Sequence, residues 1–119
     1  MNDTLHAKMT VRLYAGEEKS FGPGIARLLH QVEELHSLRA AAISMNMAYS
    51  KAWSIIRQAE SSLGFPLLNR TVGGRNGGGA NLTDEAAELL RTYDVYCSEV
   101  ESYAKALFEE KFAFLSQEK

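Results

Sequence analysis

The segment SLRAAAISMNMAYSKAWSIIRQAESSLGFPLLNRTVGGRNGGGANLT, residues 37–83, contains the signals that decide the fold. Ser37 can cap a short helix over residues 38–44, in which three consecutive alanines permit another helix to approach closely. The triplet MNM at 45–47 interrupts this helix, and Asn46 tolerates the left-handed conformation that a tight turn requires. A second helix is predicted from about residue 49 to residue 63, with Gly64 as its C-cap. The side that we expect this helix to bury consists of Ala52, Ile55, Ile56, Ala59 and Leu63.

A glycine-rich hairpin is predicted after the second helix. FPLLNRT, residues 65–71, is typical of a strand, and Asn81–Leu82 of a short returning strand. Glycine fills five of the seven positions 73–79, around Arg75. A P-loop would place a lysine and a hydroxyl residue after its last glycine, whereas Ala80 and Asn81 follow here, so a nucleotide site is not predicted. Short helix, tight turn, longer helix and hairpin are the order of a winged helix-turn-helix.

The residues before residue 37 are expected to support this unit. MTVRLY, residues 9–14, alternates apolar and polar positions like a strand, AGEEKS forms a turn, and Phe21 begins a short return strand. Pro23 suits the first turn of a helix, where its missing N–H costs nothing. The buried stripe predicted for this helix consists of Ile25, Leu28, Leu29, Val32 and Leu35.

A long helix of about thirty residues is predicted to follow Thr83, which can serve as its N-cap. Its apolar residues repeat at intervals of four and three, the pattern of a coiled-coil seam. These seam residues are Leu89, Tyr93, Tyr96, Val100, Tyr103 and Leu107. Part of the seam is expected to cover the core of the domain itself, so that not every seam residue can face a partner. We expect the helix to pair with a second copy and to hold two recognition helices about one DNA turn (~34 Å) apart. Residues 1–83 would form the DNA-binding domain and residues 84–119 the dimerisation helix of the same structural unit.

The net charge of −2 conceals a strong division along the chain. Residues 37–83 carry five Lys and Arg residues against one acid, a net charge of +4. Residues 84–119 carry four bases against nine acids, a net charge of −5. The basic middle segment is consistent with a surface that faces a polyanion, although scattered bases on a solvated face would give the same count.

Three stretches resemble one known family: GPGIARLLHQVEELHSLRAAA from residue 22, MAYSKAW from residue 47 and LLNRTVGGRNGGGANLT from residue 67. Together they are similar to the N-terminal DNA-binding domain of the molybdate-responsive ModE regulators, within the wider LysR-type winged-helix group. The resemblance covers roughly residues 9–95 and implies a sequence-specific transcriptional regulator that binds operator DNA as a homodimer. Full-length members carry C-terminal molybdate-binding domains. Because the sequence ends at Lys119, we expect no such domain, and a separate partner could sense molybdate instead.

The predicted DNA contacts come from the second helix and the hairpin. Ser50, Lys51, Ser54 and Arg57 fall at helical spacing on the side opposite the expected core positions. A solvated polar face would show the same spacing. The resemblance adds Tyr49 to the recognition helix, and Arg70, Thr71, Arg75 and Asn76 to the hairpin. Trp53 is expected to pack as an anchor rather than to contact a base.

Other classes of function have little support in the sequence. The three histidines and Cys97 show no metal-ligand spacing, no nucleophile motif is present, and we expect neither an enzyme nor a cofactor. The sequence contains no apolar run long enough for a membrane span and no secretory signal, so we expect a cytoplasmic protein. The alternative is a protein-interaction adaptor that recruits a partner through its acidic last helix.

Overall fold

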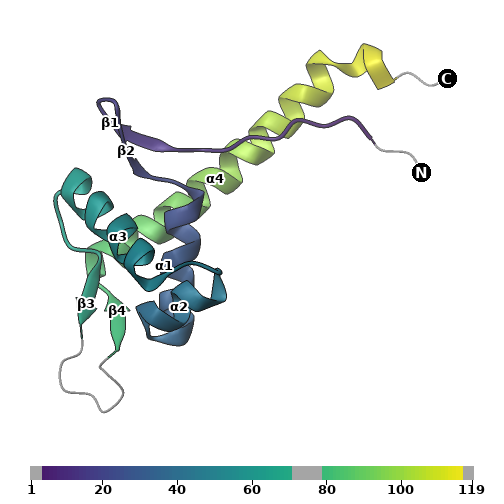
Figure 1. Ribbon diagram of the computed structural model, residues 1–119. Coiled ribbons are helices and arrows are strands. Elements are labelled where there is room, and N and C mark those ends of the chain that lie inside the picture. Colours follow the sequence, from purple (N-terminus) through teal and green to yellow (C-terminus); the bar gives the residue numbers. More distant parts are fainter. Residues whose placement is uncertain (1–3, 71–78, 117–119) are drawn as a thin grey trace.

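The computed structural model of the chain describes residues 4–70 and 79–116. In chain order these residues form β1 (Leu13–Ala15), β2 (Glu18–Phe21), α1 (Pro23–Leu35), α2 (Leu38–Ser44), α3 (Tyr49–Leu63), β3 (Leu68–Arg70), β4 (Ala80–Leu82), α4 (Asp84–Lys111) and the 3-10 helix η1 (Ala113–Ser116). The strands form two antiparallel hairpins, β1–β2 and β3–β4. Figure 1 shows a compact group of helices and strands from which α4 projects. The predicted fold class, mainly helical with a hairpin wing and a long C-terminal helix, is confirmed.

The first hairpin differs from the predicted one: its first strand is shorter, and its return strand begins at Glu18 and ends at Phe21, where the sequence predicts the strand to begin. The strand expected over residues 9–14 begins only at Leu13, which pairs with Phe21, and Gly16 turns the chain at a φ of 63°. The ladder stops there because β2 ends at Phe21 and Pro23, which has no N–H to donate, opens α1. Residues 4–12 therefore continue as an extended segment without a ladder partner.

α1 occupies the centre of the core. Four of the five residues predicted to form its buried stripe are buried, namely Ile25, Leu28, Leu29 and Val32. The prediction for Leu35 is wrong: its side chain is 41% exposed. Leu35 is the last residue of the helix, and the chain turns away at His36 with a φ of 57°.

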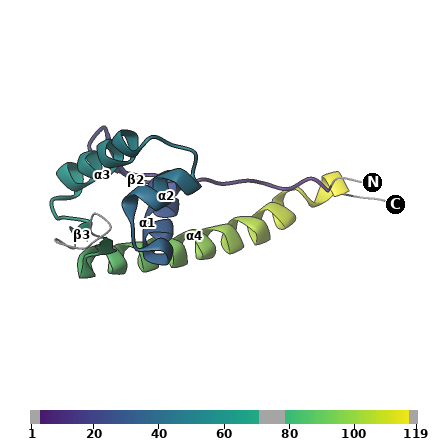
Figure 2. The ribbon, with the colours of Figure 1, turned by 60° about the horizontal axis from the view of Figure 1, so that its bottom comes forward.

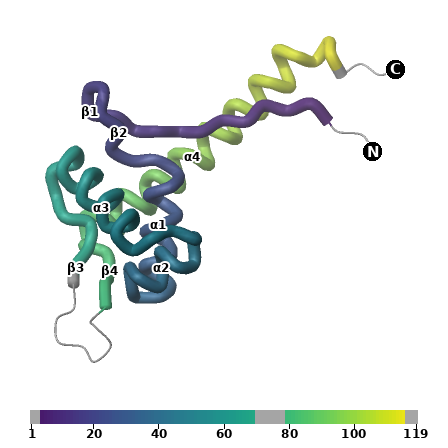
Figure 3. Tube along the Cα trace, in the orientation of Figure 1, coloured from purple at the N-terminus to yellow at the C-terminus, as the bar shows by residue number. Residues whose placement is uncertain are grey.

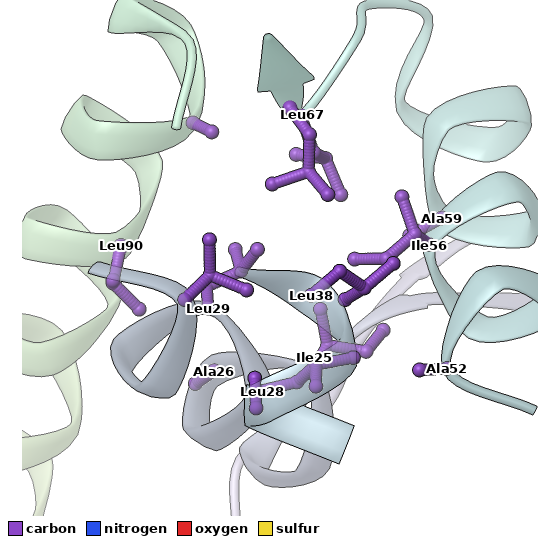
Figure 4. Packing of buried hydrophobic residues seen from close by; sticks show 14 of the residues in the cluster. Ile25, Ala26, Leu28, Leu29, Leu38, Ala52, Ile56, Ala59, Leu67 and Leu90 are labelled. Carbon is purple, nitrogen blue, oxygen red and sulfur yellow. The ribbon is translucent and has the colours of Figure 1, made fainter. Parts of the chain in front are cut away.

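The core joins α1 to the elements on both sides of it. Figure 4 shows the α1 side chains between Ile56 of α3 and Leu90 of α4, with Leu67 above them. Leu28, Leu29, Ile56, Leu67 and Leu90 are all fully buried. Because α1 packs against both neighbours, the orientation of α3 relative to the start of α4 is fixed by apolar packing.

Thr83 fixes the start of α4. Its hydroxyl oxygen accepts a hydrogen bond from the backbone N–H of Ala86 (3.0 Å), as expected for an N-cap. The same hydroxyl donates to the carbonyl of Pro66 (2.7 Å), and the Thr83 side chain is buried. One side chain therefore caps the helix and ties it to the segment that leads into β3.

Thr83→Ala should lower the free energy of unfolding by about 1–2 kcal/mol, because both hydrogen bonds are lost at a buried helix start. Thr83→Ser keeps the hydroxyl and should retain most of the stability. Urea unfolding of the two variants and the parent measures the difference. An equal loss in Ser and Ala variants would contradict a role for the hydroxyl.

Tyr93 belongs to the core of its own domain, whereas the spacing of the sequence places it on the dimer seam. Its side chain is 6% exposed, and its ring packs edge-on against Phe21 with 5.0 Å between ring centroids. Its hydroxyl donates to the carbonyl of Val11 (2.6 Å). Burial, assisted by a hydrogen bond involving Cys97, raises the pKa of Tyr93 to about 12. Because Tyr93 fills this internal position, we leave it out of the proposed subunit contact.

The raised pKa of Tyr93 predicts a loss of stability at alkaline pH. Below about pH 10 the phenol is protonated in both the folded and the unfolded chain, so its contribution is fully present. As the pH rises from about 10 to about 12, the unfolded chain releases the proton first, and folding is progressively disfavoured. Tyr93→Phe should be less stable by about 1 kcal/mol at pH 8, because the hydrogen bond of the hydroxyl is lost. Its free energy of unfolding should nevertheless change less with pH across the alkaline range than that of the parent.

Urea unfolding at several pH values compares the two proteins. Tyr14→Phe is the matched control, because Tyr14 is 58% exposed and lies on β1. The control should follow the parent at every pH. A Tyr93→Phe profile parallel to that of the parent above pH 10 would refute the titration of Tyr93.

Candidate nucleic-acid interface

The turn between α2 and α3 brings the two helices close together. Ser37 caps α2 by accepting from the backbone N–H of Ala40, and Asn46 adopts a φ of 57°, both as predicted. The N–H of Met47 donates back to the carbonyl of Ala42 (2.9 Å), which closes the turn. Ala41 and Ala42 of α2 and Ala52 of α3 are essentially fully buried. Small side chains at this crossing allow the close helix packing that a helix-turn-helix requires.

α3 separates an apolar side from a polar and basic side. Ala52, Ile56 and Ala59 are buried, whereas Ile55 and Leu63, also predicted on the buried side, are half-buried. The predicted contact residues Ser50, Lys51, Ser54 and Arg57 are all exposed. Hydroxyl, ammonium and guanidinium groups on one helix face can donate hydrogen bonds to phosphate oxygens and to base edges.

Two arginines stack on two aromatic rings beside this face. The guanidinium of Arg39, from α2, lies 4.1 Å from the ring centroid of Tyr49 at the start of α3. The guanidinium of Arg57 lies 5.2 Å from the ring centroid of Trp53, and the two rings meet edge to face at 6.4 Å. A guanidinium attracted to the face of an aromatic ring is restrained there and can still donate hydrogen bonds to an acceptor. The stacks therefore orient two exposed cations on the α2–α3 surface.

Trp53 is half-buried and packs against the core, in line with its predicted role as an anchor. Arg39 is not among the contact residues predicted from the sequence, although it is exposed and lies over the ring of Tyr49. The sequence shows Arg39 only as a base in the first turn of α2. Its contact with the Tyr49 ring, ten positions later, depends on how the turn folds and has no signal in the sequence.

The second hairpin is attached to the end of α1. Its register pairs Leu68 with Leu82, Asn69 with Asn81 and Arg70 with Ala80, so both strands are three residues long. The N–H of Ala80 donates to the carbonyl of His36 (3.1 Å), and the His36 ring contacts the Asn81 side-chain oxygen (3.3 Å). Arg70 is the last residue of β3, whereas Thr71, Arg75 and Asn76 lie outside the described residues. β4 packs against α1, and Figure 1 shows the hairpin away from the distal half of α4.

The seam residues of α4 divide into two groups. Leu89 and Tyr93 pack on the core of the same domain. Tyr96 (53%), Tyr103 (70%) and Leu107 (38%) are exposed, and Val100 between them is half-buried. An exposed apolar stripe on a helix that leaves the domain is an unusual surface for a monomer.

One ion pair and one histidine–carboxylate hydrogen bond join α4 to α1. Arg91 donates to Glu33 (2.5 Å), and His30 contacts Asp94 (2.8 Å). All four side chains are partly exposed, so each pair contributes little stability on its own. The pairs join α1, which supports α3, to the helix that carries the exposed seam.

Among residues 4–70 and 79–116, no three His, Cys, Asp or Glu side chains gather in a group that could hold a metal ion. Nor does any helix in these ranges combine the length and the apolar character of a membrane span.

The fold and the surface together define a winged helix-turn-helix protein: a tight helix-turn-helix with a polar and basic second helix, followed by an antiparallel hairpin. Residues 26–87 match the family described as "Bacterial regulatory helix-turn-helix protein, lysR family". The match covers more than half of the 119 residues, and the chain belongs to this family.

Individual relatives include proteins named for ModE. The chain is 37% identical over 73 residues, 61% of its length, to "Transcriptional regulator ModE" of Haemophilus influenzae. It is 34% identical over 83 residues (70%) to "Molybdenum transport protein ModE" of Azotobacter vinelandii, and 31% identical over 91 residues (76%) to "Transcriptional regulator ModE" of Yersinia pestis. The aligned segments span 29%, 31% and 32% of the lengths of these relatives, respectively. The resemblance to the ModE regulators is confirmed.

Proposed function

We propose that the chain is a transcriptional regulator that binds double-stranded DNA as a homodimer. The observation that carries the proposal is the exposed side of α3, where Ser50, Lys51, Ser54 and Arg57 project from a helix-turn-helix of the LysR family. Residues 1–83 would contact the DNA and residues 84–119 would pair the subunits. A regulator of this kind would act in the cytoplasm, where bacterial DNA lies. It would bind DNA without a catalytic group or a cofactor.

The basic and the hydroxyl residues would contact different parts of the DNA. Arg39 and Arg57, oriented by their aromatic partners, would bind phosphates on either side of the groove, and Lys51 would add charge. Ser50 and Ser54 would reach base edges, since a hydroxyl can donate to or accept from a base. Arg70, Thr71, Arg75 and Asn76 are proposed to contact the flanking backbone from the hairpin. Phosphate contacts set the affinity, and base contacts set the sequence preference.

The names of the relatives support a regulator of the molybdate-responsive type. We propose that molybdate acts on this regulator through a separate partner, and the ModE names of the relatives are what supports a response to molybdate. Selection of bound sequences from a random duplex pool, with and without molybdate, would provide the operator and reveal any direct effect of the anion.

DNA binding by the purified chain should weaken as salt is raised, because phosphate contacts release counterions. Arg57→Ala should weaken binding about equally on every sequence and reduce the slope of log affinity against log salt by about 1. Ser50→Ala should weaken binding to the selected operator more than to random duplex, by about 1–3 kcal/mol. Fluorescence anisotropy of labelled duplexes at several salt concentrations measures both effects.

Ser98→Ala is the matched control, because Ser98 is an exposed serine on α4, far along the chain from the helix-turn-helix. It should leave affinity and salt slope unchanged. Affinity that does not respond to salt would contradict phosphate binding, and an equal loss for Ser50→Ala on all sequences would contradict base contact.

An adaptor function is the second candidate, and the acidic surface of α4 is the observation in its favour. Glu99, Glu101, Glu109 and Glu110 are exposed along the part of the helix that leaves the domain. A purified dimer that fails to bind any duplex in dilute buffer would favour this candidate over the regulator.

A further inference from the structure

The N-terminal arm, defined as residues 4–12, has the pattern of a strand but pairs with none in the described chain. Its backbone is extended, and apolar and polar residues alternate along it. The apolar side consists of Leu5, Ala7, Met9 and Val11, and the polar side of Thr4, His6, Lys8, Thr10 and Arg12. Strict alternation indicates a segment that covers an apolar surface on one side.

Only the inner end of the arm is held by its own domain. Val11 is partly buried against the core, and its carbonyl accepts the hydrogen bond from Tyr93. Residues 4–10 are all exposed, including Leu5 at 62% and Met9 at 49%. The domain therefore sets where the arm begins and in which direction it leaves, yet leaves its apolar side uncovered.

The arm and the distal half of α4 leave the domain in the same direction. Figures 1, 2 and 3 show the outer end of residues 4–12 and the distal end of α4 on the same side of the molecule. Tyr96, Tyr103 and Leu107 are exposed on this half of α4. A partner helix paired with that seam would lie in the region through which the arm passes.

The charges of the arm and the helix are complementary. The arm carries Lys8 and Arg12 and no acid. Beyond Asp94 the helix exposes Glu99 and Glu101, and neither of these carboxylates enters an ion pair within the described ranges. A basic segment beside an acidic helix favours contact, although such exposed charges mainly guide association.

We propose that the arm is part of the subunit interface, packing Leu5 and Met9 of one chain against α4 of a second copy, with Lys8 beside the acidic residues of that helix. This inference rests on the proposed homodimer and adds a contact between the arm and α4 to the pairing of the two helices. The helix pair alone buries a narrow seam, whereas two arms, one from each chain, would cover its flanks.

The first test measures dimer dissociation by sedimentation. Leu5→Ser combined with Met9→Ser should raise the dimer dissociation constant by about tenfold or more, because two buried apolar side chains are lost from each arm. Tyr14→Ser is the matched control: it removes an exposed apolar side chain from β1, at the opposite end of the molecule. Circular dichroism should show the same fold in all three proteins. A dissociation constant that the double variant leaves unchanged would overturn the inference.

The second test asks whether the arm crosses to the other chain. In a Cys97→Ser background, which removes the one native cysteine, a chain with Met9→Cys is mixed with a size-tagged chain carrying Ser102→Cys. Each chain then has a single thiol, so a bismaleimide can link only different chains. A covalent product of mixed size is expected. A stable dimer without that product would refute the arm contact and leave the regulator intact, whereas the absence of any dimer would refute the proposed homodimer itself.

Discussion

Leu107→Glu should convert the protein to a monomer and reduce its affinity for an operator with two half-sites by about 100-fold or more. Leu107 is 38% exposed and lies on the distal part of α4, beyond the buried residues of the helix. A carboxylate there would have to be desolvated between two helices that already carry many acids. Once the subunits separate, the second half-site no longer benefits from the high effective concentration of a linked domain. Binding to a single half-site should change little.

Sedimentation and anisotropy on one-site and two-site duplexes distinguish this effect from misfolding. Ser98→Glu is the matched control, because Ser98 is exposed and precedes Leu107 by nine residues, which is about two and a half helical turns. The same charge then lies on the opposite side of α4 and should leave the dimer intact. A Leu107→Glu protein that remains dimeric, or a control that dissociates equally, would show that the seam does not pair the subunits.

Local signals in the sequence predicted most of the elements, because each depends on neighbouring residues. Ser37 and Thr83 cap helices through their own hydroxyls, Asn46 adopts the left-handed turn, and Gly64 ends α3 with a φ of 89°. The polar side of α3 was predictable in the same way, since helical spacing alone separates Lys51 and Arg57 from Ile56. These features need no information from distant parts of the chain.

The features that sequence reasoning missed depend on contacts between distant residues. Tyr93 fits a heptad as well as the neighbouring seam residues do, and only the approach of Val11 and Phe21 makes it internal. Arg39 looks like any surface base until the turn places it over Tyr49. The short first strand is set by where its partner ends, which alternation within residues 9–14 cannot reveal. Periodicity identifies an apolar side of a helix but not what covers it.

Ile56→Ala should lower the free energy of unfolding by about 2–5 kcal/mol, which is a large fraction of the stability of a domain this small. Ile56 is fully buried and is the point at which α3 meets α1 in the core, as Figure 4 shows. The truncation leaves a cavity behind the recognition helix, so α3 loses the support that holds Ser50, Lys51 and Arg57 in one orientation. DNA affinity should therefore fall together with stability, although Ile56 has no exposed surface with which to contact DNA.

Urea unfolding and anisotropy under the same buffer conditions separate the two effects of Ile56→Ala. Ile43→Ala is the matched control, because it makes the same chemical change on α2 at a side chain that is 68% exposed. It should change stability by less than about 0.5 kcal/mol. Low temperature, or a stabilising osmolyte that restores the folded fraction of Ile56→Ala, should restore part of the DNA binding. A variant that unfolds like the parent would show that Ile56 does not anchor α3. One that is destabilised yet binds DNA normally when folded would show that the orientation of the recognition helix is fixed by other buried residues of α3, such as Ala52 and Ala59.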